Sequence, residues 1–347
     1  MVIDKINKKI IDHVLNNPNM SSSEIHSGLD LDIGLVTIKR RLSKCVALGF
    51  LQIVGVGRAT KYTVHPGYKL FYPYEVEAYF QEEVDERIIH KQFNLDLISK
   101  ILPSVDLVSR QEREAIKLLQ EKYKHNVSRL PETVYRQELD RLGIDLSWKS
   151  SQIEGNTYSL LETEQLLKDH LEARGKKKEE AQMLLNHKIA LDYIIENSDY
   201  FKELTVSKIE EVHRLLVKDL GIDPNIRETM VGITGTNYRP LDNKFQIKEA
   251  LIEMCQLVNA KQDVFEKTLL VLSLISYIQP FSDGNKRTAR LISNAILLSW
   301  GACPLSFRSV DPIDYKKALL LFYEQNSLQA FKSMLMDQYE FAVNTYF

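Results

Sequence analysis

Glycine, proline and cysteine are all scarce in this chain of 347 residues, which contains 14, 10 and 3 of them. Because glycine and proline interrupt regular secondary structure, their scarcity favours long helices over a many-stranded sheet. The cysteines are odd in number and far apart in the sequence, which argues against a disulfide framework or a cysteine metal site. We therefore expect a cytoplasmic protein, kept in a reducing compartment.

Long apolar runs are missing as well. The most apolar stretch, residues 268–281, is too short to cross a bilayer, so we expect no membrane partner. Charged side chains interrupt the first turns of the chain, so we also expect no secretion signal. These side chains are Asp4, Lys5, Lys8 and Lys9.

The net charge of −2 hides an uneven distribution along the chain. Residues 1–70 contain ten lysines and arginines against five aspartates and glutamates, so this segment is basic and the remainder is acidic. A basic head on an acidic body indicates a nucleic-acid partner at one end only.

The first seventy residues predict three helices followed by a β-hairpin. An apolar stripe at helical spacing marks the first helix, and the third runs from about residue 36 to residue 48 and stops at Gly49. Two β-rich runs around Gly55-Val56-Gly57 predict the hairpin over residues 51–64. We interpret residues 1–70 as one small domain.

Residues 71–146 have a charged, helical pattern, and we interpret them as a helical connector. A polar stretch then leads into a helix at which Ser159 and Glu162 have the spacing of a capping box. We expect this helix to stop at Gly175. The domain boundary is predicted at the start of the polar stretch, so that a third domain covers residues 147–347.

The third domain reads as helical almost throughout, and the expected fold class is mainly α. The exception is residues 227–240, in which apolar and polar residues alternate around Gly232 and Gly235. This pattern predicts an exposed β-hairpin on an otherwise all-helical domain.

The most informative segment is IQPFSDGNKRTAR, residues 278–290. An apolar helix ends, a short loop containing Gly284 follows, and a second helix begins. Unpaired N–H groups and the helix dipole make such a helix start positive, so it predicts an anion site. Lys286 and Arg290 face one way, and Asp283 is placed to hold Mg²⁺ against phosphate oxygens. The alternative is a solvated basic helix start that Asp283 caps.

QPFSDGNKRTAR resembles the motif of the Fic family, His-Pro-Phe-x-Asp/Glu-Gly-Asn-Gly-Arg-x-x-Arg, at seven of its nine constrained positions. The resemblance implies a domain that binds ATP with Mg²⁺ and transfers AMP to a protein hydroxyl. Asp283 would bind the metal, and the backbone of Gly284 and Asn285 would hold the α- and β-phosphates. Arg287 would hold the β-phosphate, and Arg290 would hold the γ-phosphate.

Ser150-Ser151-Gln152-Ile153-Glu154-Gly155 resembles a second Fic motif, the inhibitory Ser/Thr-x-x-x-Glu-Gly/Asn. The resemblance implies that Glu154 pairs with Arg290 and obstructs the productive pose of the γ-phosphate. Ser150 and Gly155 complete this motif.

Residues 227–240 resemble the flap on which Fic proteins dock their targets, and we call this segment the flap. The resemblance implies that the flap aligns an extended target segment by β-strand addition. The residues expected to do so are Val231, Gly232, Ile233 and Thr234.

One departure from the motif concerns the general base. The family places a histidine where this chain has Gln279, and a primary amide can orient a hydroxyl but cannot take its proton. General-base catalysis contributes roughly 10²–10⁴-fold to rate, so we expect transfer to be weak. None of the other histidines lies near the motif in sequence, so no replacement base is expected.

A second departure is Lys286, which stands where AMP-transferring members have glycine. Lysine here resembles the death-on-curing toxins, a related branch that phosphorylates its targets. Those toxins lack the last arginine of the motif, which this chain has as Arg290. We count Lys286 among the nucleotide-binding residues, and the motif leaves the type of transfer open.

The N-terminal domain resembles winged-helix DNA-binding domains. Its third helix would enter the major groove, and its wing would reach flanking phosphates. The side chains expected on DNA are Thr37, Lys39, Arg40 and Lys44 of the helix and Arg58 and Lys61 of the wing. The alternative is a winged helix that makes protein contacts only.

Two function classes follow. One is a regulatory module that binds DNA and senses ATP through a Fic domain without its base. The other is a working AMP transferase or phosphotransferase that relies on Mg²⁺ and its arginines for charge stabilisation.

Overall fold

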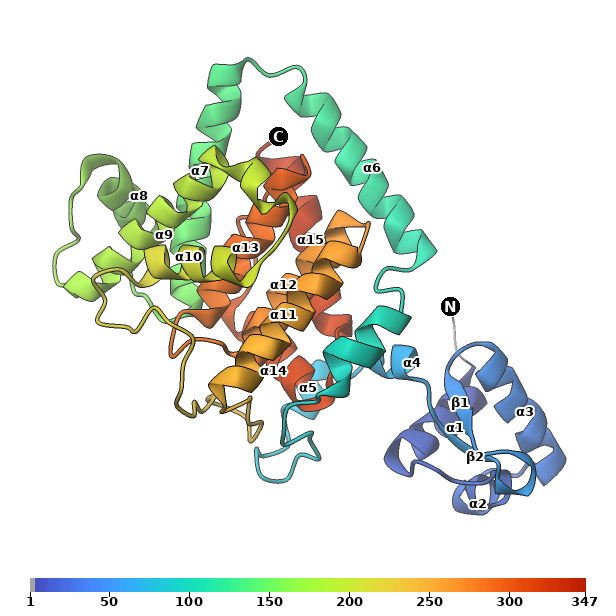
Figure 1. Ribbon diagram of the computed structural model, residues 1–347. Coiled ribbons are helices and arrows are strands. Elements are labelled where there is room, and N and C mark those ends of the chain that lie inside the picture. Colours follow the sequence, from blue (N-terminus) through green and yellow to red (C-terminus); the bar gives the residue numbers. More distant parts are fainter. Residues whose placement is uncertain (1–3) are drawn as a thin grey trace. The chain divides into compact units, whose positions relative to one another are not determined.

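The computed structural model describes residues 4–347, except for the side chain of Arg58. The chain forms two compact units (Figure 1). The smaller unit comprises the residues up to 73 together with 100–106, and the larger comprises 74–99 and 107–347.

The smaller unit contains the three helices and the hairpin that the sequence predicts. Their bounds are α1 Lys5–Asn16, α2 Ser22–Gly28, α3 Leu35–Ala47, β1 Leu51–Val54 and β2 Lys61–Val64, followed by a short α4 Pro66–Leu70. The two strands pair antiparallel, with Leu51 opposite Val64. Local signals start the helices, because Asp4 caps α1 and Ser21 forms a capping box with Glu24 at α2. Ile10, Ile38 and Leu42 are fully buried in the core of this unit.

The larger unit is built from helices, which confirms the mainly α fold class. Their bounds are α5 Val76–Tyr79, α6 Arg110–Val127, α7 Glu132–Ile153, α8 Leu160–Asp169, α9 Lys178–Glu196, α10 Val206–Val217, α11 Lys244–Ala260, α12 Val264–Ile278, α13 Asn285–Ser299, α14 Pro312–Gln325 and α15 Gln329–Thr345. A short helical turn covers Ser198–Lys202 in this unit, Leu97–Ile101 spans the boundary between the two units, and the turn Leu102–Ser104 belongs to the smaller unit.

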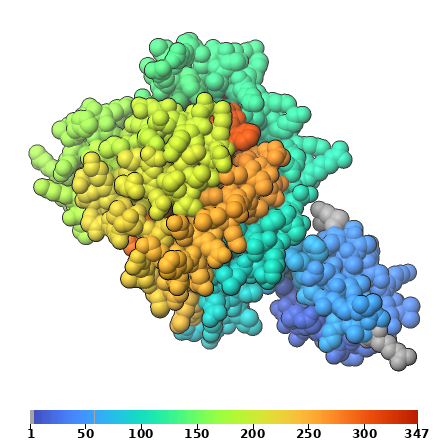
Figure 2. Space-filling view, viewed as in Figure 1, coloured from blue at the N-terminus to red at the C-terminus, as the bar shows by residue number. Residues whose placement is uncertain are grey.

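The centre of this unit is the pair α12 and α13. α13 contacts α7, α9, α10 and α12, and α11 and α14 pack against α12 (Figure 1). Every residue of α12 from Phe265 to Ile278 is buried. On the face that Figure 2 shows, only a small part of the orange-red chain beyond residue 285 is visible. A helix that is apolar on all sides is stable only inside such a core.

Among the residues that the structure describes, none of the helices is both long and apolar enough to span a membrane.

Two boundaries differ from those expected. The helix that starts at the Ser159 capping box ends at Asp169, where His170 adopts a left-handed conformation, and does not continue to Gly175. The domain boundary expected between residues 146 and 147 falls inside α7, which continues to Ile153. In the polar stretch, Ser147, Ser150 and Ser151 are fully buried, whereas Thr157 and Ser159 are exposed.

The flap contains no strand pairing between its own two arms, although the alternation of residues predicts a hairpin there. Its second arm pairs elsewhere: the Arg239 amide donates to the Lys91 carbonyl at 2.9 Å, and the Tyr238 hydroxyl donates to the Tyr277 carbonyl at 3.1 Å. Hydrogen bonds to other segments thus take the place of the hairpin ladder.

The central position of α12 predicts a large effect of truncating Leu272, which is fully buried. Leu272→Ala should lower the free energy of unfolding by about 2–5 kcal/mol because it leaves a cavity. Urea unfolding followed by fluorescence measures this, because Trp148 and Trp300 both belong to the larger unit. Leu161, which is 72% exposed, is the control, and Leu161→Ala should change stability by less than about 0.5 kcal/mol. Equal effects of the two variants would contradict the assignment of this core.

Candidate functional site

The loop between α12 and α13, residues 279–284, is held in place by one side chain. The Asn285 side chain accepts a hydrogen bond from the Phe281 amide at 2.9 Å and donates to the Phe281 carbonyl at 2.8 Å. It also donates to Oε1 of Gln279 at 2.9 Å. The first residue of α13 therefore fixes the shape of the loop that precedes it.

Gly284, the N-cap of α13, is required by both conformation and space. Its φ of +81° lies in the left-handed region, and a Cβ added there would lie 3.1 Å from Cε1 of His213. The ring of His213 stacks on Phe281 with centroids 3.6 Å apart, and its Nδ1 lies 3.2 Å from the Thr288 hydroxyl. The loop thus rests on a buried histidine from α10.

His213 lies close to the motif in space although it is distant in sequence, but it does not replace the missing base. Its side chain is fully buried, and it does not line the cleft beside the loop. Burial lowers the pKa of His213 to about 3, and the nearby Arg287 adds to this effect. The imidazole is therefore neutral and structural.

The start of α13 has the features of an anion site. No side chain caps the helix, and within the described chain the amides of residues 285–287 donate to no acceptor. Arg287 is buried, and its Nε and Nη1 lack hydrogen-bond partners, while Nη2 pairs with Asp283 at 3.1 Å. Unpaired donors at a helix start attract a negatively charged group.

The structure places Glu154 directly against this site. One carboxylate oxygen lies 2.9 Å from Nη2 of Arg290, and the other lies 2.7 Å from Nζ of Lys286. Arg290 is fully buried and also donates to the hydroxyl and the carbonyl of Ser150 at 2.9 and 2.8 Å. Gly155, at φ +99°, turns the chain immediately after the carboxylate. α7 therefore delivers one carboxylate to two cations of α13.

The electrostatics of Glu154 follow from this contact. Burial alone would raise the pKa of the carboxyl group, but Arg290 and Lys286 outweigh burial and lower the pKa to about 2. The carboxylate is thus ionised at neutral pH and is held by both partners.

Gln279 stands where the resemblance to the Fic motif expects a histidine, and both ends of its side-chain amide are engaged. Its nitrogen donates to the Ser276 carbonyl at 2.6 Å, and its oxygen accepts from Asn285. The Gln279 carbonyl accepts a hydrogen bond at 2.6 Å from the buried side chain of Arg227. Arg227 also donates to the carbonyls of Thr229 and Leu241, so it ties the loop to the base of the flap.

These elements surround one cavity of about 450 Å³, which we call the cleft. Loop and α13 residues 282–286, together with Gln279, form its floor, and Glu154 lies at one side. The flap contributes Val231, Gly232, Ile233 and Thr234, and α14 contributes Lys316, Leu319, Leu320 and Tyr323. The expected flap residues, Asp283 and Glu154 therefore meet at one cleft, whereas Ser150, Gly155, Arg287 and Arg290 do not line it.

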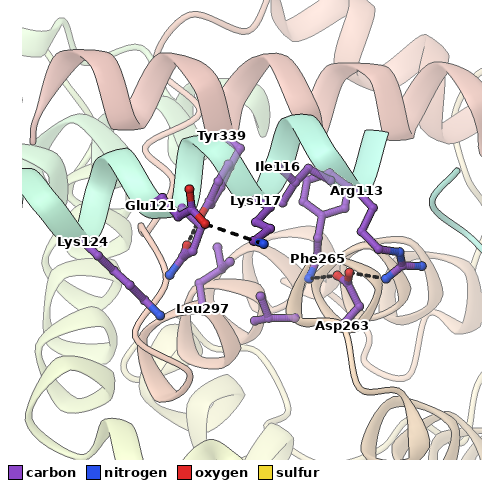
Figure 3. A pocket seen from close by; sticks show the side chains of 11 residues that line it. Arg113, Ile116, Lys117, Glu121, Lys124, Asp263, Phe265, Leu297 and Tyr339 are labelled. Carbon is purple, nitrogen blue, oxygen red and sulfur yellow. Dashed lines mark hydrogen bonds and ion pairs between the residues drawn. The ribbon is translucent and has the colours of Figure 1, made fainter. Parts of the chain in front are cut away.

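A second cavity, of about 370 Å³, lies between α6, the start of α12, the end of α13 and Tyr339 of α15 (Figure 3). Four of its charged residues already pair with one another: Arg113 lies 2.5 Å from Asp263, and Lys117 lies 3.8 Å from Glu121. No cluster of three or more histidine, cysteine, aspartate or glutamate side chains suited to a metal occurs in the described chain. The cleft is therefore the stronger candidate site.

In the smaller unit, the basic residues expected on DNA lie on the surface. Lys39, Arg40 and Lys44 of α3 and Lys61 of β2 are exposed, and Thr37 is half-buried. The side chain of Arg58 lies outside the described part of the chain. Arg41 differs from its neighbours, because it pairs with Asp4 at 3.0 Å and donates to Asn7. That arginine joins α3 to α1.

Several residues of the site have no recognisable signal in the sequence. His213, Arg227, Lys316 and Tyr323 all lie outside the recognisable motif and reach the site through the fold. Arg227 is followed directly by Glu228 at the start of the flap, and such a pair of opposite charges in sequence is typical of an ordinary surface.

Comparison with known proteins supports the motif. Residues 203–297 match the model of the Fic/DOC family. The chain contains a Fic/DOC domain. The protein adenylyltransferase Fic of Culex quinquefasciatus is 30% identical over 165 residues, which cover 44% of this chain and 31% of the relative. The protein adenylyltransferase fic-1 of Caenorhabditis elegans is 25% identical over 221 residues, or 61% of this chain and 42% of that one. The chain thus spans less than half the length of these relatives.

Solved structures show the same fold around the Fic/DOC domain. Residues 134–508 of C. elegans Fic-1 superpose with a TM-score of 0.59 at 22% identity, over 67% of this chain and 71% of that one. A Fic-domain-containing signalling protein from Bacteroides thetaiotaomicron gives 0.57 at 22% identity, over 66% of this chain and 94% of that one.

The pKa of Glu154 predicts a pH-dependent contribution to stability. Because the folded-state pKa is depressed from 4.5 to about 2, the contribution is fully present above about pH 4.5 and is lost as the pH falls towards 2. Glu154→Gln should therefore be less stable than wild type at pH 7, by roughly 3 kcal/mol at most. Unfolding free energies at pH 7, 5, 4 and 3 should show the difference shrinking at acid pH.

The control for this series is Glu164→Gln. Glu164 forms an exposed pair with Lys168, so its substitution should matter little at any pH. A deficit of Glu154→Gln that stays constant from pH 7 to pH 3 would contradict the buried ion pair.

Proposed function

We propose that this chain is an ATP-binding Fic protein of the adenylyltransferase type that transfers AMP weakly and is coupled to DNA through its smaller unit. The observation that carries the proposal is the carboxylate of Glu154 between Arg290 and Lys286 at the start of α13. A carboxylate held by two cations occupies a site with the charge and donors that a phosphate group needs.

The phosphates of ATP fit the remainder of this site. The free amides at the start of α13 supply donors for an anionic ligand, and the buried, unpaired nitrogens of Arg287 add positive charge behind them. Gly284 lets the ligand approach the backbone closely, as it has no side chain.

Mg²⁺ fits the same place. The Asp283 side chain is 62% exposed, and its partners are the Gly284 amide and Arg287. One carboxylate next to phosphate oxygens is a common way for a protein to hold this ion. When bound, Mg²⁺ would neutralise phosphate charge, and Asp283 would hold it.

Slow transfer follows from two features of the cleft. Gln279 cannot take a proton, and one donor and one acceptor of its amide already bond to Ser276 and Asn285, so only its second N–H and second lone pair are left to orient a hydroxyl. Glu154 holds Arg290, so the γ-phosphate lacks its partner until this ion pair opens. The Fic relatives that share this region are named protein adenylyltransferases, which supports AMP as the group transferred.

Transfer of label from ATP tests this proposal. Gln279→His with Glu154→Gly should transfer more label from α-labelled ATP than either single variant, by roughly 10²–10⁴-fold over wild type, because it restores the base and frees Arg290. Adding Arg287→Ala to the double variant is the control, and it should abolish both transfer and ATP binding measured by titration calorimetry. Wild type that labels as strongly as the double variant would overturn the base-loss proposal.

Lys286 favours a second candidate, phosphotransfer. Its ammonium lines the cleft at the position where AMP transferases have glycine, and a cation there would favour a different orientation of the nucleotide. In the same experiment, a gain of γ-label without α-label would favour phosphotransfer over AMP transfer.

The smaller unit is proposed to bind duplex DNA through α3. Lys39, Arg40 and Lys44 are exposed on this helix, and none of them makes an ion pair within the described chain. The alternative, a role in protein contacts only, predicts no affinity for DNA.

Paired substitutions test the DNA proposal in the full chain. Replacing Lys39 and Arg40 with alanine should weaken binding to duplex DNA and reduce the slope of log K against log salt by about 2, because two phosphate contacts are lost. Replacing the exposed Lys8 and Lys9 of α1 makes the same change in net charge and should leave the slope unchanged. Identical behaviour of the two variants, or no binding by wild type at low salt, would favour protein contacts.

A further inference from the structure

The two walls of the cleft are connected by a segment that lies outside the matched family region. Residues 80–92, which we call the strap, follow α5 and bind both the flap and the end of α14. Asn237 of the flap donates to Asp85 at 2.8 Å, and the Arg239 amide donates to the Lys91 carbonyl. On the other side, the His90 amide donates to the Glu324 carbonyl of α14 at 2.9 Å.

One side chain of the strap reaches both walls at once. The guanidinium of Arg87 lies 3.1 Å from the Glu324 carboxylate through Nη1 and donates to the Gly235 carbonyl at 2.8 Å through Nη2. Arg87 and Glu324 are almost fully buried, and the Tyr79 hydroxyl donates to the same carboxylate at 2.7 Å. The planar fork of arginine is suited to such a double contact.

The stability of the core does not explain this arrangement. Nε of Arg87 and Oε1 of Glu324 are buried without hydrogen-bond partners in the described chain. An incompletely satisfied buried ion pair stabilises a fold no better than a well-packed apolar pair. An apolar pair, however, could not donate to the Gly235 carbonyl.

We propose that Arg87 is a positioning residue that fixes the separation of the flap and α14, and with it the width of the cleft. The flap needs such a support, because residues 230–234 make no backbone hydrogen bond within the described chain. Leu320 of α14 lies against Gly235, where an added Cβ would be 3.3 Å from its Cδ1, so the flap meets α14 beside the Arg87 contact. That the cleft binds ATP rests on the proposed function, whereas the contact of Arg87 with Glu324 and Gly235 does not.

Amide hydrogen exchange in the full chain tests this proposal. Arg87→Lys keeps a charge beside Glu324 but lacks the fork, so it should lose the Gly235 contact. Exchange at Tyr238 and Arg239 should then rise on the order of tenfold or more. Exchange at the Arg227 amide, which donates to the Pro280 carbonyl, should not change.

Two further variants keep the test decisive. Arg87→Met combined with Glu324→Met removes both charges, so no buried charge is left unpaired, and it should show the same rise in exchange at the flap. Arg308→Met is the matched control. Arg308 forms a 2.9 Å ion pair with Asp145, and neither residue belongs to the flap. Amide exchange at the flap of this variant should equal that of wild type. Wild-type exchange at Tyr238 and Arg239 in both Arg87 variants would overturn the positioning role.

ATP titration of the same proteins separates this inference from the proposed function. Wild type that binds no ATP would contradict the proposed function, while the exchange result would still decide whether Arg87 fixes the flap.

Discussion

The fully buried guanidinium of Arg290 is the group on which the arrangement of the site depends. A buried charge without a partner is strongly destabilising, so the fold must supply an acceptor for it. The end of α7 supplies three acceptors: the hydroxyl and the carbonyl of Ser150 and the carboxylate of Glu154. This requirement constrains the positions of three elements: the end of α7, the left-handed Gly155 and the first turns of α13. Any anionic ligand of Arg290 must therefore compete with an acceptor that belongs to the protein itself.

The loop of residues 279–284 is also held in place by buried side chains, which here form hydrogen bonds to its backbone. Asn285 fixes the loop from inside, and Arg227 joins its carbonyl groups to the flap. His213 supports it from α10 by stacking on Phe281. Donors that are already oriented lose little entropy when a ligand arrives, so a loop fixed in this way is suited to holding phosphates.

Local signals predicted much of this molecule, and long-range contacts account for the rest. The capping box at Ser159 correctly marks the start of α8, because a cap involves only four neighbouring residues. The flap was expected to pair with itself, but its second arm pairs with Lys91, nearly 150 residues earlier, and no pattern within the flap records that partner. The same holds for Arg87 and His213. Their roles depend on which helices meet, and a charged or aromatic residue looks the same in sequence wherever it packs.

Under the proposed function, the groups that would hold a nucleotide are separate from Gln279, which stands where the Fic motif has a histidine. Backbone amides, Arg287 and Arg290 do not titrate near neutral pH, and replacing histidine by Gln279 leaves all of them in place. The amide of Gln279 also satisfies the Ser276 carbonyl and the Asn285 side chain without carrying a proton that can leave. Under the proposed function, ATP would then occupy the cleft without rapid consumption. ATP binding would depend on competition between its phosphate and the Glu154 carboxylate for Arg290. The flap, held in place by the strap, would then contact a partner according to whether ATP is bound.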